Sequence, residues 1–159
     1  MLNHQKNQIK TLRSLLTSDY VKESSKHITY NRLLPSPVYQ NSKSIHIYSS
    51  CENEVDTQYI INHAKKSSKD IFYPTNDPYN NNTSVDLVII PGLLFDKQCN
   101  RNGRGRGYYD MYLSKTNAYK VALCYEFQVF DEIETHEHDV TMDMIITEKE
   151  MYFKHFGQY

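Results

Sequence analysis

Apolar residues recur at helical spacing in three segments of the chain. In residues 5–16 the isoleucine and leucines fall on one helical face. Residues 17–19 (Thr-Ser-Asp) are typical of a helix end followed by a new N-cap. A second helix is predicted from about 20 to 34, where Pro35 opens a Pro-Ser-Pro stretch that cannot continue it. A third helix is predicted over residues 57–67.

Five short segments rich in aliphatic and β-branched residues predict strands, at residues 44–49, 70–73, 85–90, 120–124 and 144–146. Their alternation with helices predicts an α/β fold, a three-layer αβα domain with a mainly parallel, Rossmann-like sheet, in one domain over 1–159. Ligands bind at the carboxyl ends of such strands. We therefore expect the loops after Tyr48, Ile90 and Cys124 to share one rim.

Composition excludes several classes of protein. The chain has 159 residues and a formal net charge of −1, which argues against a general nucleic-acid or anionic-membrane binder. Its three cysteines show no paired spacing, so a reducing compartment is expected. No apolar run is long enough to span a membrane, and the first 16 residues lack the apolar core of a signal peptide. We expect a cytoplasmic monomer that binds small molecules.

Arginine and glycine concentrate in one short segment. The chain has five of each, and three of each lie between Arg101 and Gly107. Alternating glycines let the backbone approach a ligand, and arginines donate bidentate hydrogen bonds to phosphate oxygens. A predicted helix follows, which favours an anion at its start. These features predict a triphosphate-binding loop, although an RGG-like nucleic-acid segment or a solvated turn uses the same residues.

Two carboxylates are candidate ligands for Mg²⁺ on those phosphates, Asp110 and Asp139. The alternatives are a first-turn helix carboxylate for Asp110 and a turn residue for Asp139. The His-Glu-His triplet at 136–138 suggests zinc only weakly, and a solvated acidic loop is favoured. Cys51 and Cys124 are interpreted as buried or half-buried thiols without a catalytic partner. Tyr108 and Tyr109 lie beside the glycines and could stack on a ring.

Three longer segments of the sequence together match the pattern of a known protein family. Residues 91–113 contain PGLLFDK, then Arg101, then GRGRGYYDMYL; residues 122–143 contain ALCY, FQ, HDV and an aspartate; residues 49–57 end in EVDT. This pattern resembles the 5-formyltetrahydrofolate cyclo-ligase family, also called methenyltetrahydrofolate synthetases. The resemblance covers about residues 44–148. It implies a fold related to ribose-5-phosphate isomerase A and the CoA transferases, in agreement with the predicted elements.

The resemblance also implies an activity and a site. Members of the family use ATP and Mg²⁺ to convert 5-formyltetrahydrofolate, a reduced folate, to 5,10-methenyltetrahydrofolate, ADP and phosphate. It implies ATP contacts from Arg101, Gly103, Arg104, Gly105, Arg106, Gly107, Tyr108 and Tyr109, and folate contacts from Ser49, Glu54 and residues 104–108. It implies Arg104, Arg106 and Tyr109 as catalytic residues, and Asp110 and Asp139 as Mg²⁺ ligands.

Three departures from the family pattern leave an alternative open. The segment 75–84 is shorter than usual, so a wall of the substrate site is expected to be reduced. The N-terminal basic pair has no clean match, with Lys6, Lys10 and Arg13 as candidates. Cys99 and Asn102 stand where Gly and Leu are usual. The alternative is therefore a non-catalytic relative that binds folate or nucleotide.

Overall fold

The computed structural model describes residues 2–77, 81–103 and 107–155. The helices are α1 (Leu2–Ser14), α2 (Ser18–His27), α3 (Pro37–Asn41), α4 (Gln58–Lys66) and α5 (Tyr108–Leu113), with a π-helical turn η1 (Ile28–Leu33) after α2 and a 3₁₀ turn η3 (Glu126–Gln128). Thr17 caps α2 as predicted, because its side chain accepts a hydrogen bond from the backbone N–H of Tyr20. The Arg104, Gly105 and Arg106 of the predicted phosphate loop lie outside the described residues.

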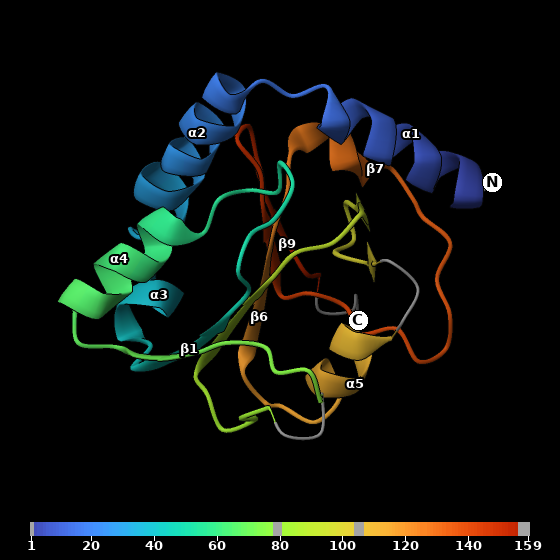
Figure 1. Cartoon of the computed structure of the whole chain (residues 1–159). Helices are drawn as coiled ribbons and strands as arrows, with labels where there is room; N and C mark the ends of the chain where they lie inside the picture. The colour runs from blue at the N-terminus through green and yellow to red at the C-terminus, as the bar shows by residue number, and fades with distance from the viewer. Residues whose placement is uncertain (1, 78–80, 104–106, 156–159) are drawn as a thin grey trace.

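The main sheet contains β1 (Ser44–Ile47), β2 (Asp70–Phe72), β3 (Leu87–Ile90), β6 (Tyr119–Leu123), β8 (Met144–Ile146) and β9 (Met151–Phe153). Its strand order is β2-β1-β3-β6-β8-β9, and the neighbours are parallel except for the pair β8–β9. In Figure 1 helices α2, α3 and α4 lie on one side of this sheet and α5 on the other. The predicted three-layer α/β architecture with a mainly parallel sheet is therefore confirmed.

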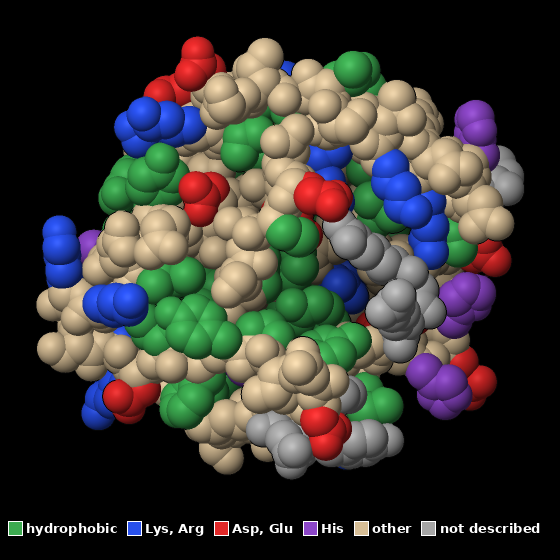
Figure 2. All heavy atoms as spheres, viewed as in Figure 1, with side chains coloured by type: hydrophobic (Ala, Val, Ile, Leu, Met, Phe, Trp, Pro, Cys, Tyr) green, Lys and Arg blue, Asp and Glu red, His purple; other side chains and the backbone are tan. Residues whose placement is uncertain are grey.

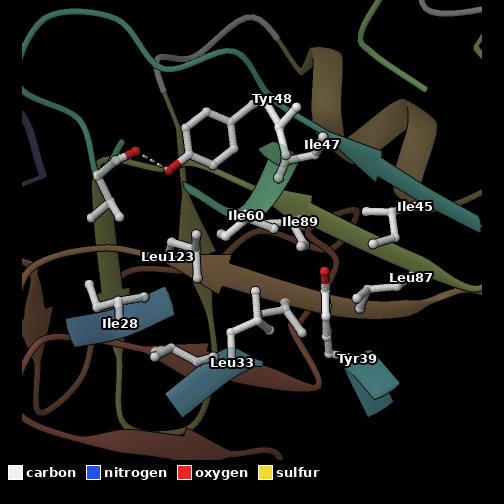
Figure 3. Close-up of a cluster of buried hydrophobic side chains, with 14 of the residues drawn as sticks. Ile28, Leu33, Tyr39, Ile45, Ile47, Tyr48, Ile60, Leu87, Ile89 and Leu123 are labelled. Carbon is white, nitrogen blue, oxygen red and sulfur yellow. Dashed lines mark hydrogen bonds between the residues drawn. The ribbon is translucent and has the colours of Figure 1, made fainter. Parts of the chain in front are cut away.

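Alternate residues of the central strands enter two separate cores. In β3, Leu87 and Ile89 pack toward α2, α3 and α4, whereas Val88 and Ile90 pack toward α5. β6 alternates in the same way, and all four residues of β3 are buried. Figure 3 shows the first core, where the Tyr48 hydroxyl donates a hydrogen bond of 2.8 Å to the Val55 carbonyl oxygen. Burial on both faces explains why VDLVII lacks a polar alternation.

Three elements differ from the sequence prediction. The second helix was expected to run without a break to 34, but it changes at His27 into η1, whose wider turn buries Ile28, Thr29 and Leu33 together. Residues 144–146 were expected to form the last strand, but the half-exposed edge strand β9 follows. A second sheet of order β5-β4-β7 was not predicted, because its strands are only two or three residues long.

The second sheet lies beside the carboxyl ends of the main strands and contains β4 (Leu94–Asp96), β5 (Arg101–Asn102) and β7 (Val129–Phe130). Helix α1 covers it, because Ile9 packs with Leu93, Leu94 and Ile133 in a third apolar cluster. This small sheet therefore places β5 and α1 on the same side of the molecule (Figure 1).

His46 lies in the middle of β1 and faces the α5 core. Its ring stacks on Tyr112, with 4.5 Å between centroids and 28° between planes. Burial lowers its pKa from the usual 6.5 to about 4, while a weaker interaction with the Asn81 side chain acts in the opposite direction. The folded protein therefore holds a neutral imidazole at neutral pH.

This burial predicts acid sensitivity. Because the folded pKa is depressed, the contribution of His46 to stability is complete above pH 6.5 and is lost as pH falls toward 4. A shift of this size corresponds to about 3 kcal/mol between those limits. Urea unfolding at pH 7 and pH 4.5 should show a smaller loss for His46→Phe, which keeps the stacking, than for the wild type. Equal losses in both proteins would contradict the assignment.

Candidate active site

The strand order creates one crevice in the main sheet. From β1 the chain runs outward to β2 and then returns past β1 to form β3, so the connections after β1 and β3 leave in opposite directions. Ligands of open α/β sheets bind at such a switch point. A cavity of about 870 Å³ lies here, within the size range of small-molecule sites. Figure 2 shows hydrophobic side chains across the middle of this face, with Lys or Arg side chains beside them.

The cavity brings together predicted residues from distant parts of the sequence. Its lining includes Ser49, Glu54, Arg101, Gly103, Gly107, Tyr108, Tyr109, Asp110 and Asp139. All the predicted site residues that the structure describes therefore lie around one cavity. The Zn²⁺ alternative at 136–138 finds no support, because the described residues contain no group of three potential metal ligands and these side chains are exposed.

The loop after Cys124 was expected to lie on the same rim as the other two loops. It is hydrogen-bonded to the two loops that line the cavity and is not itself among the lining residues. The Gln128 side chain donates hydrogen bonds of 3.0 Å to the carbonyl oxygens of Gly92 and Leu93. The Tyr125 hydroxyl donates to the carbonyl oxygen of Asn53 at 2.8 Å. These bonds join the loop after β6 to the loops after β3 and β1, both of which line the cavity. Gln128 therefore holds the walls without contacting the space between them.

Arg101 is a buried cation at the centre of the site. Its Nε donates a 2.8 Å hydrogen bond to the Pro91 carbonyl oxygen, and its guanidinium lies 5.1 Å from the centroid of the Tyr109 ring. Only 6% of the residue is exposed. Burial lowers its pKa, and the nearby Asp110, Tyr109 and Asp139 act against that shift, as does Glu54. Since guanidinium stays protonated in proteins, Arg101 presents a fixed positive charge.

Asp110 and Asp139 converge from separate segments, the first turn of α5 and the loop before β8. Burial raises the pKa of Asp110, Arg101 opposes the shift, and the negative charge of Asp139 adds to it. Asp139 accepts a 2.7 Å hydrogen bond from the His136 backbone N–H. Within the described part of the chain no donor reaches the buried Oδ1 of Asp110. Burying a carboxylate oxygen without a hydrogen-bond donor costs folding free energy, and a cation between the Asp110 and Asp139 side chains would compensate its charge.

Glu54 is held in its loop by Cys51. Its Oε1 accepts hydrogen bonds from the backbone N–H of Cys51 at 3.0 Å and from its thiol at 3.2 Å. Glu52 and Asn53 between them adopt positive φ angles of 39° and 56°, which makes the loop a sharp turn. The prediction that Cys51 is buried is wrong, because this turn exposes it at the cavity. Cys124 is buried as predicted, and burial raises its pKa.

Helix α1 brings two of the three N-terminal basic candidates, Lys6 and Arg13, to the main cavity. Lys6 and Arg13 are seven residues apart, which is two turns, so both side chains line the main cavity. Lys10 instead lines a smaller adjoining cavity, to which Arg13 also contributes. The apolar periodicity of α1 already contained this information, because Ile9 fixes which face is buried. The spacing of Lys6 and Arg13 on that face was the signal that sequence reasoning did not use.

Asp96 organises the turn that carries Arg101. Its fully buried carboxylate accepts hydrogen bonds from the backbone N–H groups of Gln98 and Asn100, from the Asn100 amide and from the N–H of Ile133, all at 3.0–3.1 Å. Cys99 lies within this turn at a φ of +67°, where a glycine is easiest to place. Asp96 therefore acts on the fold of the Arg-Gly segment and does not reach the cavity.

The helix after the Arg-Gly segment differs from the expectation. α5 has only six residues, so its dipole favours an anion less than a long helix would. Its N-cap is Gly107, at a φ of +66° and with open space where a Cβ would be. The positive charge of Arg101, rather than the helix end, is the larger attraction for an anion here.

Known proteins share this sequence and architecture. A sequence profile described as the 5-formyltetrahydrofolate cyclo-ligase family matches residues 75–148. A mouse protein named 5-formyltetrahydrofolate cyclo-ligase is 29% identical over 180 aligned positions, covering 86% of this chain and 88% of its own. A Schizosaccharomyces pombe protein named as a probable cyclo-ligase is 24% identical, covering 86% and 93%.

Two solved structures share the fold. The 5,10-methenyltetrahydrofolate synthetase of Aquifex aeolicus superimposes with a TM-score of 0.86 at 24% identity, covering 100% of this chain and 96% of that one. That of Mycoplasma pneumoniae gives a TM-score of 0.80 at 24% identity, covering 92% and 98%. The class is thus an α/β domain with the methenyltetrahydrofolate synthetase architecture.

The resemblance found in the sequence is confirmed by these matches. Over residues 75–148 the chain matches the profile of the 5-formyltetrahydrofolate cyclo-ligase family, and over most of its length it is similar to proteins of that name. The alignment with the mouse protein is longer than the whole of this chain, so that relative carries residues without a counterpart here. The Aquifex protein is covered almost completely, so the fold does not depend on those additional residues.

Two glycines of the site should respond differently to substitution. A Cβ on Gly92 would lie 2.4 Å from Cζ of Phe95 and 3.1 Å from Nε of Arg101, so Gly92→Ala must displace buried groups. We expect it to lower the free energy of unfolding by about 1–3 kcal/mol. Gly107→Asn should cost less than about 1 kcal/mol, because Asn tolerates left-handed backbone and the space is open. Urea unfolding of both variants checks this, and equal losses would contradict it.

Proposed function

We propose that the chain is a 5-formyltetrahydrofolate cyclo-ligase that couples ATP to the formation of 5,10-methenyltetrahydrofolate, ADP and phosphate. The observation that carries the proposal is the single cavity at the switch point. It collects Ser49, Glu54, Arg101, Gly103, Gly107, Tyr108, Tyr109 and both aspartates. The names of the relatives and of the two solved structures support the same activity.

The cavity lining contains two kinds of side chain that suit the two substrates. Lys6 and Arg13 of α1 and Arg101 supply positive charge. Tyr108 and Pro74 supply aromatic and apolar surface. We assign the triphosphate to the cationic groups and the pterin ring of the folate to the aromatic wall, because phosphates need donors and planar rings need stacking surfaces. Arg104 and Arg106 belong to the same proposal as further phosphate contacts.

The proposed reaction needs positioning more than a protein nucleophile. The formyl oxygen on N5 attacks the γ-phosphorus of ATP, and ADP leaves with the electrons of the broken bond. N10 then attacks the activated formyl carbon, loses its proton, and phosphate departs as the five-membered ring closes. The protein holds the two substrates in line and neutralises the phosphate oxygens. Tyr109 contributes by holding the Arg101 guanidinium with its ring.

The residues present fit a Mg²⁺ ion on the phosphates. Mg²⁺ commonly takes one or two carboxylates with phosphate oxygens and waters, so Asp110 and Asp139 suffice without a third protein ligand. The buried Oδ1 of Asp110, without a donor among the described residues, is the atom that such an ion would satisfy. When bound, the ion would offset phosphate charge during transfer.

The alternative is a relative that binds folate or nucleotide without catalysis. It was suggested by the short segment 75–84 and by the unclear basic pair. The α1 register places two basic side chains at the cavity, and both aspartates face it, which favours the enzyme. We propose further that the protein is a cytoplasmic monomer of one domain. Among the described residues no helix is long and apolar enough to cross a membrane.

The activity is tested by incubating the protein with Mg²⁺, ATP and 5-formyltetrahydrofolate and following the near-ultraviolet absorbance of the methenyl product. The proposal expects absorbance to rise only when ATP and folate are both present. Tight binding of either ligand without any absorbance change would favour the non-catalytic relative. Binding of neither would reject the family assignment as a guide to function.

The metal ligands can be tested against a matched carboxylate. Asp110→Asn and Asp139→Asn should each raise the Mg²⁺ concentration for half-maximal rate by at least about tenfold. Loss of a residue that only hydrogen-bonds to a metal ligand already weakens metal affinity by about tenfold or more, and these two aspartates are proposed as ligands themselves. Asp131→Asn is the control, because Asp131 is an exposed carboxylate paired with Lys97 at 2.8 Å. EDTA should abolish turnover. Activity that survives EDTA, or a control that shifts as much as the two variants, would refute the site.

A further inference from the structure

Three residues beside the cavity, Thr75, Asn81 and Tyr108, share a hydrogen-bond cluster, and the Thr75 hydroxyl also lies 2.6 Å from the Asp77 carbonyl oxygen as a second acceptor. The Asn81 Oδ1 accepts from the Thr75 backbone N–H at 2.9 Å and from its hydroxyl at 3.0 Å. The Asn81 Nδ2 donates to the Tyr108 hydroxyl oxygen at 2.8 Å, and that hydroxyl donates to the Thr75 carbonyl oxygen. Asn81 is only 7% exposed, so these bonds replace water that it cannot reach.

We propose that Asn81 is a positioning residue that fixes the ring of Tyr108 as a wall of the folate end of the site. The proposal rests on the proposed cyclo-ligase function and extends it to a residue outside the cavity lining. Asn81 does not line the cavity, whereas Tyr108 and Pro74, which precedes Thr75, both do. The cluster therefore joins two wall segments that are far apart in the sequence.

The base of this cluster is anchored to rigid parts of the fold. The Tyr112 hydroxyl donates to the Asn82 carbonyl oxygen at 2.7 Å, and the Thr116 hydroxyl to that of Thr83 at 2.8 Å. Tyr112 is fully buried and stacks on His46 of β1. Residues 81–83 are thus held against α5 and the sheet, so the position of Asn81 follows from the packed core.

Among the described residues, the Tyr108 hydroxyl is hydrogen-bonded to Thr75 and Asn81 alone. Tyr108 follows Gly107, which has a left-handed backbone and where an added Cβ would meet no described atom within 4 Å. Its ring meets Tyr109 edge to face, with centroids 5.2 Å apart, and Tyr109 in turn lies under Arg101. The Tyr108 ring therefore packs on Tyr109, which contacts Arg101, and the Tyr108 hydroxyl is hydrogen-bonded to Thr75 and Asn81. A ring fixed at both ends costs less entropy when a planar substrate stacks on it.

The cluster also explains how a short connection serves this site. The segment 75–84 was expected to leave the folate poorly enclosed because it is shorter than in the family pattern. Its described residues instead use side-chain hydrogen bonds to stiffen the aromatic wall. This gives Asn81 a role that composition alone does not indicate, since a run of asparagines is typical of an exposed loop tip.

Two variants and a matched control test the proposal. Tyr108→Phe keeps the ring and removes both of its hydroxyl bonds. Asn81→Ala removes the Nδ2 donor to the Tyr108 hydroxyl and the Oδ1 acceptor for Thr75. Asn76→Ala changes the same residue type in the same segment at an exposed position. Steady-state rates with varied folate and varied ATP separate the KM of each substrate from kcat, and thermal unfolding checks the fold.

We expect Tyr108→Phe and Asn81→Ala each to raise the KM for 5-formyltetrahydrofolate about tenfold, the size expected when one buried partner is lost. The KM for ATP and kcat should change less than about twofold, since the phosphate contacts remain. The double variant should be no worse than the more affected single variant, because both break one cluster. Asn76→Ala should match the wild type in every parameter.

Failure of the proposal differs from failure of the proposed function. An unchanged folate KM in Tyr108→Phe, or a rise in the ATP KM alone, would overturn the positioning role while leaving the activity intact. A wild type without turnover would reject the activity; the same variants are then compared by calorimetric binding of 5-formyltetrahydrofolate. Weaker binding in both variants would support the positioning role. Equal binding in all proteins, or none by the wild type, would overturn it.

Discussion

A buried guanidinium holds the candidate active site together. A charge removed from water must be compensated locally, or the fold loses more than the charge contributes. Arg101 meets this demand with the Pro91 carbonyl oxygen, the face of Tyr109 and the field of the nearby carboxylates. Those partners come from the loop after β3, from α5 and from the loop before β8. The need to compensate one cation therefore brings three distant segments to one place.

The same charge makes the acidic pair tolerable. Asp110 and Asp139 repel each other, and burial alone would push the pKa of Asp110 higher; the positive charge of Arg101 acts against both effects. A bound cation and a triphosphate would extend this pattern of alternating charge outward into the cavity.

The scaffold supplies the precision that this pattern needs. The two-sided burial of β3 and β6 leaves no freedom of register, so the loops at their carboxyl ends start from fixed positions. The small sheet adds a second support, because Asp96 gathers four hydrogen bonds and holds the turn that leads into β5. Asp96 and the strand residues of β3 are buried and do not line the cavity.

Most of the architecture could be predicted from the sequence, because strands buried on both faces read as apolar runs and helices as a 3.6-residue period. The short strands β4, β5 and β7 could not, since two or three residues carry no period. The candidate site residues of the glycine-rich motif were proposed from unusual composition and family pattern, and those that the structure describes line the cavity. Asn81 and Gln128 were not, because their roles depend on hydrogen bonds across 27 and 36 residues of sequence.

The most direct test follows the oxygen of the formyl group. In the proposed reaction this oxygen attacks the γ-phosphorus of ATP and leaves with the phosphate. A single-turnover reaction with 5-formyltetrahydrofolate labelled with ¹⁸O at the formyl group should therefore place the label in inorganic phosphate. Label found in water instead, with unlabelled phosphate, would mean that ATP is hydrolysed separately from ring closure, and the proposed coupling in this cavity would be wrong.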